Sequence, residues 1–297
     1  MNPVLEVRNL KKVYRGGEGP AVDNVSFSMA RGEMIGVIGP SGAGKSTLLR
    51  CINRLVTPTA GHIFIEGEEM TGAPAVRVRG LRRRVGMVFQ HHNLVARLTV
   101  MQNVMHGRLG YMSTLDGILG RYQEADKKQA VEILTQTGLG SFLYHRAGEL
   151  SGGQRQRVGI VRALMQQPSI LLCDEPIASL DPASAQVVMD LIRDVCHRSA
   201  IACIVNLHQV DAALRYSDRI IGMYRGGIVF DGPAAELKES VIEKIYNKPI
   251  KQLMIGDGIK GGIRDEIREG MHSGIREEPH DGIRDGIKEG LRDGQNG

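Results

Sequence analysis

The stretch Gly39–Thr47 reads GPSGAGKST and lies between an apolar run, MIGVIG, and a segment of helical character, STLLRCINRL. This order of strand, G-x-x-x-x-G-K-S and helix is typical of a phosphate-binding loop. Its glycines allow successive backbone N–H groups to point inward at the positive end of a helix. Lys45 is expected to contact the β- and γ-phosphates of a nucleotide, and the Ser46 hydroxyl to bind Mg²⁺. A glycine-rich turn with a chance lysine would not need this strand and helix, so the motif predicts a P-loop nucleotide-binding core.

An acidic pair follows a second apolar strand. Residues 169–176 read SILLCDEP, with Asp174 and Glu175 at the end of the apolar run and Pro176 after them. Open α/β sheets present their ligand sites at the carboxyl ends of strands. Asp174 is expected to hold the Mg²⁺ shell, directly or through water, and Glu175 to orient and deprotonate an attacking water. The alternative is a solvated strand end without a role.

Hydrophobic periodicity predicts an α/β fold with a P-loop NTPase (RecA-like) core. Short β-like runs separated by turn signals dominate residues 1–90 and indicate an antiparallel β subdomain. Residues of about 91–155 lose that pattern, and QEADKKQAVEILTQTG predicts an amphipathic helix that ends near Gly138. From about 156 to 235, apolar strands alternate with helices, which indicates a parallel sheet covered on both faces. We therefore expect one domain over residues 1–245, with a helical subdomain at about 91–155.

Composition excludes several classes of protein. Aromatic residues make up 4% of the chain and Trp is absent, so base-stacking surfaces for nucleic acid are not expected. The apolar runs are of strand length, and the N-terminus lacks the pattern of a signal peptide. The four cysteines show no CxxC pairing and are expected to be buried, reduced thiols. These features predict a cytosolic chain whose membrane role, if any, comes through a partner.

Charge is distributed unevenly along the chain. Residues 256–297 carry seven bases and ten acids, a net charge of −3, which leaves +8 on residues 1–255. The run Arg77, Arg79, Arg82, Arg83, Arg84 could suggest nucleic acid, but a solvated helix face is expected because no aromatic residues accompany it.

Residues 246–297 are expected to form a low-complexity charged tail. From Ile255 an apolar residue recurs at every fourth position, in units close to Asp/Glu-Gly-Ile-Arg/Lys that Pro279 interrupts. A four-residue repeat rotates by about 40° per unit on a helix of 3.6 residues per turn, so it makes no single apolar stripe. The glycines also disfavour a helix. A disordered or partly helical tail and a segment that docks on a partner both remain open.

Together these motifs resemble the ATP-binding subunits of ABC transporters over residues 4–235. The resemblance rests on the P-loop, on DEP at 174–176, and on LSGGQ at 150–154, the signature of that family. DEPIASLDP, INRL, FQHHNLVARLTVMQNV and HQVDAALRYSDRIIG are similar, more narrowly, to the ATPase subunit of phosphonate importers. Ala43 stands where Ser is frequent in the family, and Ile177 stands where Thr is common.

The resemblance implies a role for each matching residue. Tyr14 corresponds to the aromatic residue that stacks on adenine, Gln90 to the glutamine that contacts Mg²⁺, and His208 to the histidine that senses the γ-phosphate. Ser179-Leu180-Asp181 corresponds to the loop that crosses the dimer interface. The residues expected to bind the nucleotide are then Tyr14, Gly39, Pro40, Ser41, Gly42, Ala43, Gly44, Lys45, Ser46, Thr47 and Gln90. The residues expected to bind the metal are Ser46, Gln90 and Asp174. The residues expected to act in catalysis are Glu175, His208 and Lys45.

The resemblance also implies that two copies share each site. Ser151, Gly152, Gly153, Gln154 and Asp181 of a second subunit would close over ATP, and a helix N-terminus after the signature would add positive potential. The implied cofactors are ATP and Mg²⁺. The implied partners are a second ATPase subunit, integral membrane permease subunits and an extracytoplasmic solute-binding protein, with no nucleic acid, at the cytoplasmic face of the membrane. The implied activity is ATP hydrolysis that energises uptake of phosphonates or related phosphorus oxyanions.

Two other functions remain open from the sequence. One is the ATPase of a different solute uptake system, such as one for amino acids. The other is a soluble ABC accessory protein of phosphonate metabolism, although the tandem second ABC unit common in soluble members is missing here.

Overall fold

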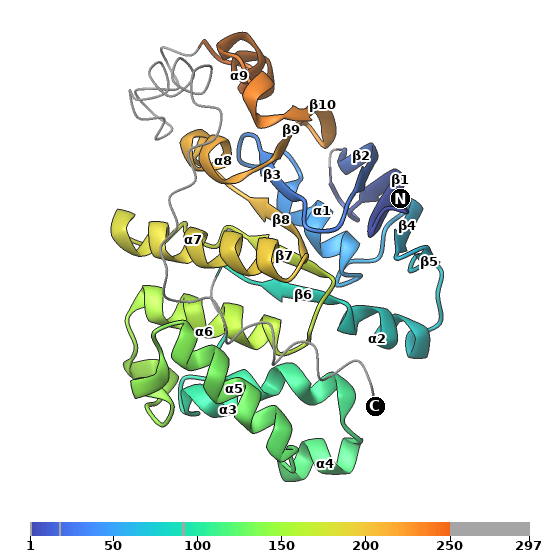
Figure 1. Ribbon diagram of the computed structural model, residues 1–297. Coiled ribbons are helices and arrows are strands. Elements are labelled where there is room, and N and C mark those ends of the chain that lie inside the picture. The colour runs from blue at the N-terminus through green and yellow to red at the C-terminus, as the bar shows by residue number, and fades with distance from the viewer. Residues whose placement is uncertain (1, 18, 91–92, 250–297) are drawn as a thin grey trace. The chain divides into compact units, whose positions relative to one another are not determined.

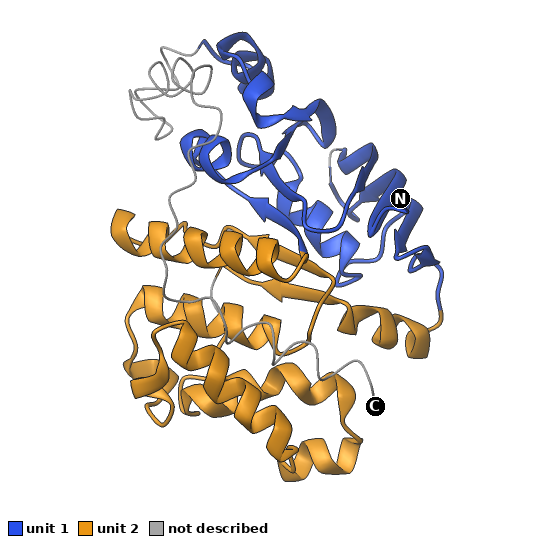
Figure 2. Ribbon diagram, in the orientation of Figure 1, with its two compact units in different colours: residues 1–73, 202–279 blue, residues 74–201, 280–297 orange. Residues whose placement is uncertain are grey.

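The computed structural model describes residues 2–17, 19–90 and 93–249 (Figure 1). These residues form two compact units (Figure 2). Unit 1 contains the described residues up to Ala73 and those from Ala202 to Pro249, and unit 2 runs from Pro74 to Ile201. Among the described residues, no helix is both long and apolar enough to cross a membrane.

Unit 1 begins with an antiparallel sheet of four strands in the order β2-β1-β4-β5. The strands are β1 (Leu5–Val13), β2 (Pro20–Met29), β4 (Ala60–Ile65) and the short β5 (Glu68–Glu69). Val7 of β1 lies opposite Phe27 on one side and Ile63 on the other, and all three side chains are buried. Alternate residues of β2 are buried over its second half, as expected for strands with one face on a core.

The second sheet of unit 1 is built on β3 (Met34–Ile38), whose five residues are all buried. It pairs in parallel with β8 (Ala202–Asn206) and with β9 (Arg219–Tyr224), and β10 (Gly227–Pro233) pairs antiparallel with β9. The helices of this unit are α1 (Lys45–Ile52), α8 (Val210–Tyr216), the 3₁₀ turn η4 (Ala234–Glu236) and α9 (Glu239–Tyr246). Continuous burial of β3 and β8 agrees with helices on both faces.

Unit 2 holds a parallel pair of strands and most of the helices. Strand β6 (Val85–Val88) pairs with β7 (Ile170–Asp174), and both strands are buried throughout. The α-helices are α2 (Ala75–Arg83), α3 (Val100–Met105), α4 (Thr114–Leu119), α5 (Glu124–Gln136), α6 (Gly152–Leu164) and α7 (Pro182–Arg198). Three 3₁₀ turns join them: η1 (His106–Tyr111), η2 (Gly140–Phe142) and η3 (Ala147–Glu149).

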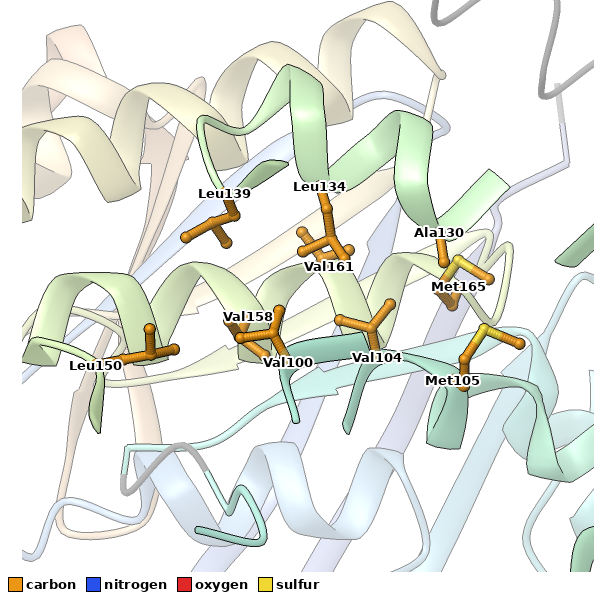
Figure 3. Packing of buried hydrophobic residues seen from close by; sticks show 10 residues of the cluster. All are labelled: Val100, Val104, Met105, Ala130, Leu134, Leu139, Leu150, Val158, Val161 and Met165. Atoms are coloured by element: carbon orange, nitrogen blue, oxygen red, sulfur yellow. The ribbon is translucent and has the colours of Figure 1, made fainter. Parts of the chain in front are cut away.

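The helices α3, α5 and α6 share one hydrophobic core, drawn in Figure 3. Val100 and Val104 of α3 meet Val158 and Val161 of α6, while Ala130 and Leu134 of α5 cover them. Spacings of three and four residues place these side chains on one face of each helix. The core also contains Met105, Leu139, Leu150 and Met165.

The predicted α/β class is confirmed, with the expected antiparallel sheet near the N-terminus and parallel strands in both units. The helix predicted before Gly138 is α5, and Gly138 takes the left-handed conformation, with φ of +69°, that ends it. The helical subdomain at 91–155 and the domain boundary at 245 stay predictions. The predicted repeat, which begins at Ile255 in the predicted tail of residues 246–297, lies outside the described residues.

The core of unit 2 gives a test of stability. We expect Leu134→Ala to lower the free energy of unfolding by about 2–5 kcal/mol, because Leu134 is fully buried and its loss leaves a cavity. The measurement is urea unfolding followed by circular dichroism. Val131→Ala on the same helix is the matched control, since Val131 is 38% exposed and its truncation should cost about 0.5 kcal/mol or less. Equal effects of the two changes would contradict the assignment of this core.

Candidate functional site

The predicted phosphate loop connects β3 to α1, as its sequence context requires. Gly39 and Gly44 have φ of +147° and +102°, a conformation that residues with a side chain rarely adopt. Neighbouring backbone also fills the space where their side chains would be. A Cβ at Gly39 would lie 2.2 Å from the Met223 carbonyl oxygen, and one at Gly44 would lie 2.0 Å from that of Ala21. Glycine is therefore required at both positions.

Backbone hydrogen bonds hold this loop in place from one side. The Ala43 carbonyl accepts a hydrogen bond from Gly226 N–H at 3.0 Å, in the turn between β9 and β10. The Gly226 carbonyl in turn accepts from Asp23 N–H of β2 at 2.8 Å. The sequence motif carried no signal for this anchor, because Gly226 lies far along the chain.

The Lys45 side chain is buried, with 5% of its surface exposed, and it contacts the loop from which it comes. Its Nζ donates to the Gly39 carbonyl at 2.7 Å and to the Pro40 carbonyl at 3.1 Å. Burying an ammonium group is costly unless charge or strong acceptors compensate it. Phosphate oxygens are stronger acceptors for an ammonium group than neutral carbonyl oxygens, so the loop fits an anionic ligand.

The start of α1 adds further positive potential to the loop. Its N-cap is Gly44, which has no side chain to occupy the first N–H groups of the helix. No acidic residue lies in its first turn. Ser46 and Thr47, both half-buried, are the second and third residues of this helix. Backbone donors, a buried lysine and a helix N-terminus together fit the phosphates of a nucleotide.

His208 lies near the same end of unit 1 as the loop. Strands β3 and β8 are parallel neighbours, with Val37 opposite Asn206, and Leu207 N–H donates to the Val37 carbonyl at 3.0 Å. His208, which is exposed, thus follows β8 at the level where Gly39 follows β3. The sequence prediction of a histidine at this strand end agrees with its position. Tyr14 lies just beyond β1, 42% exposed, with Lys12 Nζ 5.0 Å from its ring centroid.

Unit 2 brings Gln90 and the acidic pair to one edge of the β6–β7 pair. The strands are parallel, with Val88 opposite Cys173, so the residues that follow them emerge at the same edge. Asp174 is the last residue of β7 and is 3% exposed, whereas Gln90 is exposed. Gln90 and Asp174 offer the hard oxygen donors that suit Mg²⁺.

Glu175 has a backbone conformation that the sequence did not reveal. Its φ is +53°, in the left-handed region that is uncommon for a residue other than glycine, asparagine or aspartate. Such conformations store backbone strain and are concentrated at functional sites. The chain then turns, since Ala178 N–H donates to the Glu175 carbonyl at 3.4 Å and Leu180 N–H to the Ile177 carbonyl at 3.2 Å. The strand therefore ends sharply at the predicted base.

The signature residues begin α6. Ser151 is the N-cap, its Oγ accepts from Gln154 N–H at 3.3 Å, and Gln154 Oε1 accepts from Ser151 N–H at 2.8 Å. This reciprocal pair is a capping box, which satisfies the first turn of the helix. Of the two glycines between them, Gly152 is half-buried and Gly153 is buried, so the lack of side chains allows close packing at this turn.

A second helix begins beside the first. Asp181 is the N-cap of α7, where its carboxylate accepts from Ser184 N–H at 3.0 Å. Hydrogen bonds from the Ser184 side chain and backbone lower the pKa of Asp181. Gly153 is buried and packs closely against Ser184. A Cβ at Gly153 would lie 3.1 Å from both Cβ and Oγ of that serine. Sequence reasoning missed Ser184; the signal was its place three residues after the N-cap.

A half-open hollow of about 190 Å³ lies at these two helix N-termini. It is lined by Ser151, Gly153, Gln154, Arg157, Ala183, Ser184 and Val187. Arg157 and the two helix N-termini favour an anion in this hollow, and the Asp181 carboxylate at the start of α7 offsets part of that effect.

The close backbone approach at Gly44 gives a test of the loop. We expect Gly44→Ala to reduce ATP affinity by about 100-fold or more, because the methyl group would collide with the Ala21 carbonyl and displace the loop. Binding of a fluorescent ATP analogue measures this. Gly67→Ala is the matched control, since Gly67 has a similar φ of +79° but nothing within 4 Å of its Cβ position. Unchanged affinity in Gly44→Ala would rule out the loop as the phosphate site.

Comparisons with known proteins agree with this geometry. The family model described as ABC transporter matches residues 22–178. The chain is 51% identical over 251 residues to a phosphonates import ATP-binding protein of Oceanobacillus iheyensis, covering 84% of this chain and 98% of that protein. It is 52% identical over 243 residues to a protein of the same name from Halalkalibacterium halodurans, covering 82% and 99%.

Solved structures show the same fold. One is a dimeric ATP-binding cassette in a post-hydrolysis state with ADP and Pi, with a TM-score of 0.66 and 32% identity over 77% of this chain and 98% of that one. Another is the ADP conformation of an ATP-binding cassette of an ABC transporter, with a TM-score of 0.71 and 28% identity over 86% and 100%. This chain belongs to the ATP-binding proteins of ABC transporters, in the group of phosphonate-import ATP-binding proteins.

Proposed function

We propose that this chain is the ATP-hydrolysing subunit of an ABC importer that takes up phosphonates or related phosphorus oxyanions. The observation that carries the proposal is a phosphate loop with a buried lysine, in a chain half identical to proteins named for phosphonate import over nearly their whole length. A related cassette binds ADP and Pi, the products of this reaction.

Within one subunit, ATP would lie on the loop of residues 39–47. Tyr14 would stack on the adenine, and Lys45 would exchange its carbonyl partners for the β- and γ-phosphates. Mg²⁺ would be held by the oxygens of Ser46, Gln90 and Asp174, where it would neutralise charge on the phosphates. The support for this set is the chemistry of its donors and their places at the start of α1 and at the carboxyl ends of β6 and β7.

Glu175 would act as the general base. It would accept a proton from a water molecule whose oxygen forms a bond to the γ-phosphorus, while the bond from that phosphorus to the bridging oxygen breaks and yields ADP and Pi. His208 would contact the γ-phosphate. The support for Glu175 is its place directly after Asp174, where its backbone takes the left-handed conformation and the chain turns at the end of β7.

A second copy would complete the site. Five residues of that copy would cover the γ-phosphate: Ser151, Gly152, Gly153, Gln154 and Asp181. The support for this cover is the hollow at the starts of α6 and α7. The dimeric state of a related cassette supports two copies. ATP that binds the closed dimer more tightly than the open state shifts the population toward the closed dimer, and hydrolysis removes this preference, so the dimer opens.

Membrane permease subunits and an extracytoplasmic solute-binding protein would be the other partners. This chain would then lie at the cytoplasmic face of the membrane as a peripheral subunit. The solute itself would contact the permease and the binding protein. A direct test is to look for a solute-binding protein encoded beside this chain and to titrate it with 2-aminoethylphosphonate in a calorimeter. We expect binding, and failure to bind any phosphonate or phosphite while binding an amino acid would overturn the proposed substrate.

Replacing the base separates binding from hydrolysis. We expect Glu175→Gln to bind ATP as the wild type does, to hydrolyse it about 10²–10⁴-fold more slowly, and to accumulate as a dimer with ATP. Phosphate release and size-exclusion chromatography with multi-angle scattering measure the two effects. The control is Glu239→Gln, at the first residue of α9. Wild-type hydrolysis in Glu175→Gln would remove this residue from the role of base.

The packing at Gly153 tests the signature. We expect Gly153→Asp to abolish hydrolysis and leave ATP binding by the phosphate loop intact, because the new carboxylate brings negative charge between two helix N-termini and presses on Ser184. ATPase assays and nucleotide titration on the same preparation measure this. Gly153→Ala combined with Ser184→Gly separates the two causes, since it restores space and adds no charge. Loss of ATP binding in Gly153→Asp would contradict the separate roles of the two loops.

A further inference from the structure

Positive charge and exposed apolar side chains are concentrated in one segment of unit 2. Residues 74–122 contain eight arginines, no lysine and one carboxylate, Asp116, a net charge of +7 in a chain whose total is +5. Seven of the thirteen large apolar side chains that are exposed among the described residues belong to this segment: Val76, Val95, Leu109, Tyr111, Leu115, Ile118 and Leu119. None of these residues belongs to the proposed nucleotide site.

The elements that carry these side chains are in contact. The 3₁₀ turn η1 packs on α2, where the Arg83 guanidinium lies 4.9 Å from the Tyr111 ring centroid. It also packs on α4, where a Cβ at Gly117 would lie 3.5 Å from Leu109 Cδ2. We call α2, η1, α4 and Arg121 together the basic-apolar surface. Four of its arginines, Arg77, Arg79, Arg82 and Arg121, are exposed.

Helix α4 is the part of this surface that most lacks cover. It has six residues, and none of them is buried. Leu115, Ile118 and Leu119 are 73%, 76% and 58% exposed, so its apolar side chains face solvent. Caps at both ends define it, with Ser113 accepting from Asp116 N–H and Gly120 in the left-handed conformation. Helices this short are marginal in water without a packing partner, so a contact that covers α4 would stabilise it.

The chain itself carries a segment of complementary composition. Residues 256–297 have a net charge of −3, and within them Ile259, Ile263, Ile267, Met271, Ile275, Ile283, Ile287 and Leu291 supply an apolar residue about every four positions. Acids outnumber bases by ten to seven in this segment, and each of its isoleucines is followed directly by Lys or Arg, as in Asp265-Glu266-Ile267-Arg268-Glu269. A basic surface with exposed leucines and an acidic segment with regular isoleucines match in both charge and hydrophobicity.

Length and tethering make this contact accessible. The 48 residues from 250 to 297 could span about 160 Å if fully extended. That is several times the radius of gyration, about 18 Å, of a folded domain of this size. A tether of this kind gives an effective concentration in the range of about 1 mM, so even a weak contact would be populated.

We propose that the acidic repeat segment, residues 256–297, docks on the basic-apolar surface of its own chain. Its isoleucines cover Leu115, Ile118 and Leu119, and its carboxylates lie against Arg77, Arg79, Arg82 and Arg121. The contact does not depend on which solute the importer carries.

Cross-linking on the full chain tests this. Thr114→Cys on α4 and Ser273→Cys in the repeat keep every apolar and charged residue, and the four native cysteines are buried. We expect a short bismaleimide to join the cysteines at 114 and 273 of one chain about tenfold faster than cysteines at 186 and 273. The second pair is the matched control, in which Gln186→Cys replaces an exposed residue of α7. Leu115→Ser with Ile118→Ser, or Asp265→Asn with Glu266→Gln and Glu269→Gln, should each remove the difference. Salt at 1 M should reduce it.

Three results would overturn the proposal. Equal rates for the two cysteine pairs would show that the segment has no preference for this surface. Cross-links only between chains would assign the surface to a second copy. Equal rates together with binding of the full chain to vesicles that contain anionic phosphatidylglycerol, lost in Leu115→Ser with Ile118→Ser, would assign it to lipid. The serine variants do not threaten folding, because α4 has no buried residue.

Discussion

The phosphate loop depends on close packing of backbone against backbone. Gly44 faces the Ala21 carbonyl of β2 and Gly39 faces the Met223 carbonyl of β9, with no room for a side chain at either. Hydrogen bonds through Gly226 tie the same loop to the β9–β10 turn and to β2. The antiparallel sheet and the parallel sheet of unit 1 thus meet at this loop. That contact fixes the backbone of the loop and its N–H groups, so the backbone needs little reorganisation to bind a phosphate.

The signature residues at the start of α6 are held in place by packing between two helix ends. The starts of α6 and α7 lie together because Gly153 has no side chain and Ser184 fills the space beside it. Each helix satisfies its own cap, Ser151 with Gln154 and Asp181 with Ser184. The two loops of the sequence therefore differ in structure: the first encloses the side chain of Lys45, and the second forms a hollow at two helix ends that Arg157 lines.

The elements that could be predicted from the sequence are those that residues close together in the chain determine. Helix α7 lies within residues 156–235, where helices were expected between strands, because Asp181 caps it, proline occupies its first position and apolar residues recur at helical spacing. Strand β7 and the phosphate loop were predicted for similar reasons. The left-handed Glu175, the anchor at Gly226 and the contact of Gly153 with Ser184 depend on residues distant in sequence or on a backbone angle. Helix α4 was not predicted either, since with no buried residue it has no amphipathic pattern to detect.

The basic-apolar surface is connected to the signature by one helix. In η1, the Tyr111 hydroxyl donates to the Gln166 carbonyl at 2.7 Å and Arg108 donates to the Met165 carbonyl at 3.3 Å, at the C-terminal end of α6. Gly107 lies directly against that end, where a Cβ would be 2.2 Å from the Arg162 carbonyl. The other end of α6, about 20 Å away, begins with Ser151 and the signature glycines. The core shared with α3 and α5 holds α6 along its length. A ligand that contacts η1 on this surface therefore touches the element that is hydrogen-bonded to the C-terminal end of α6.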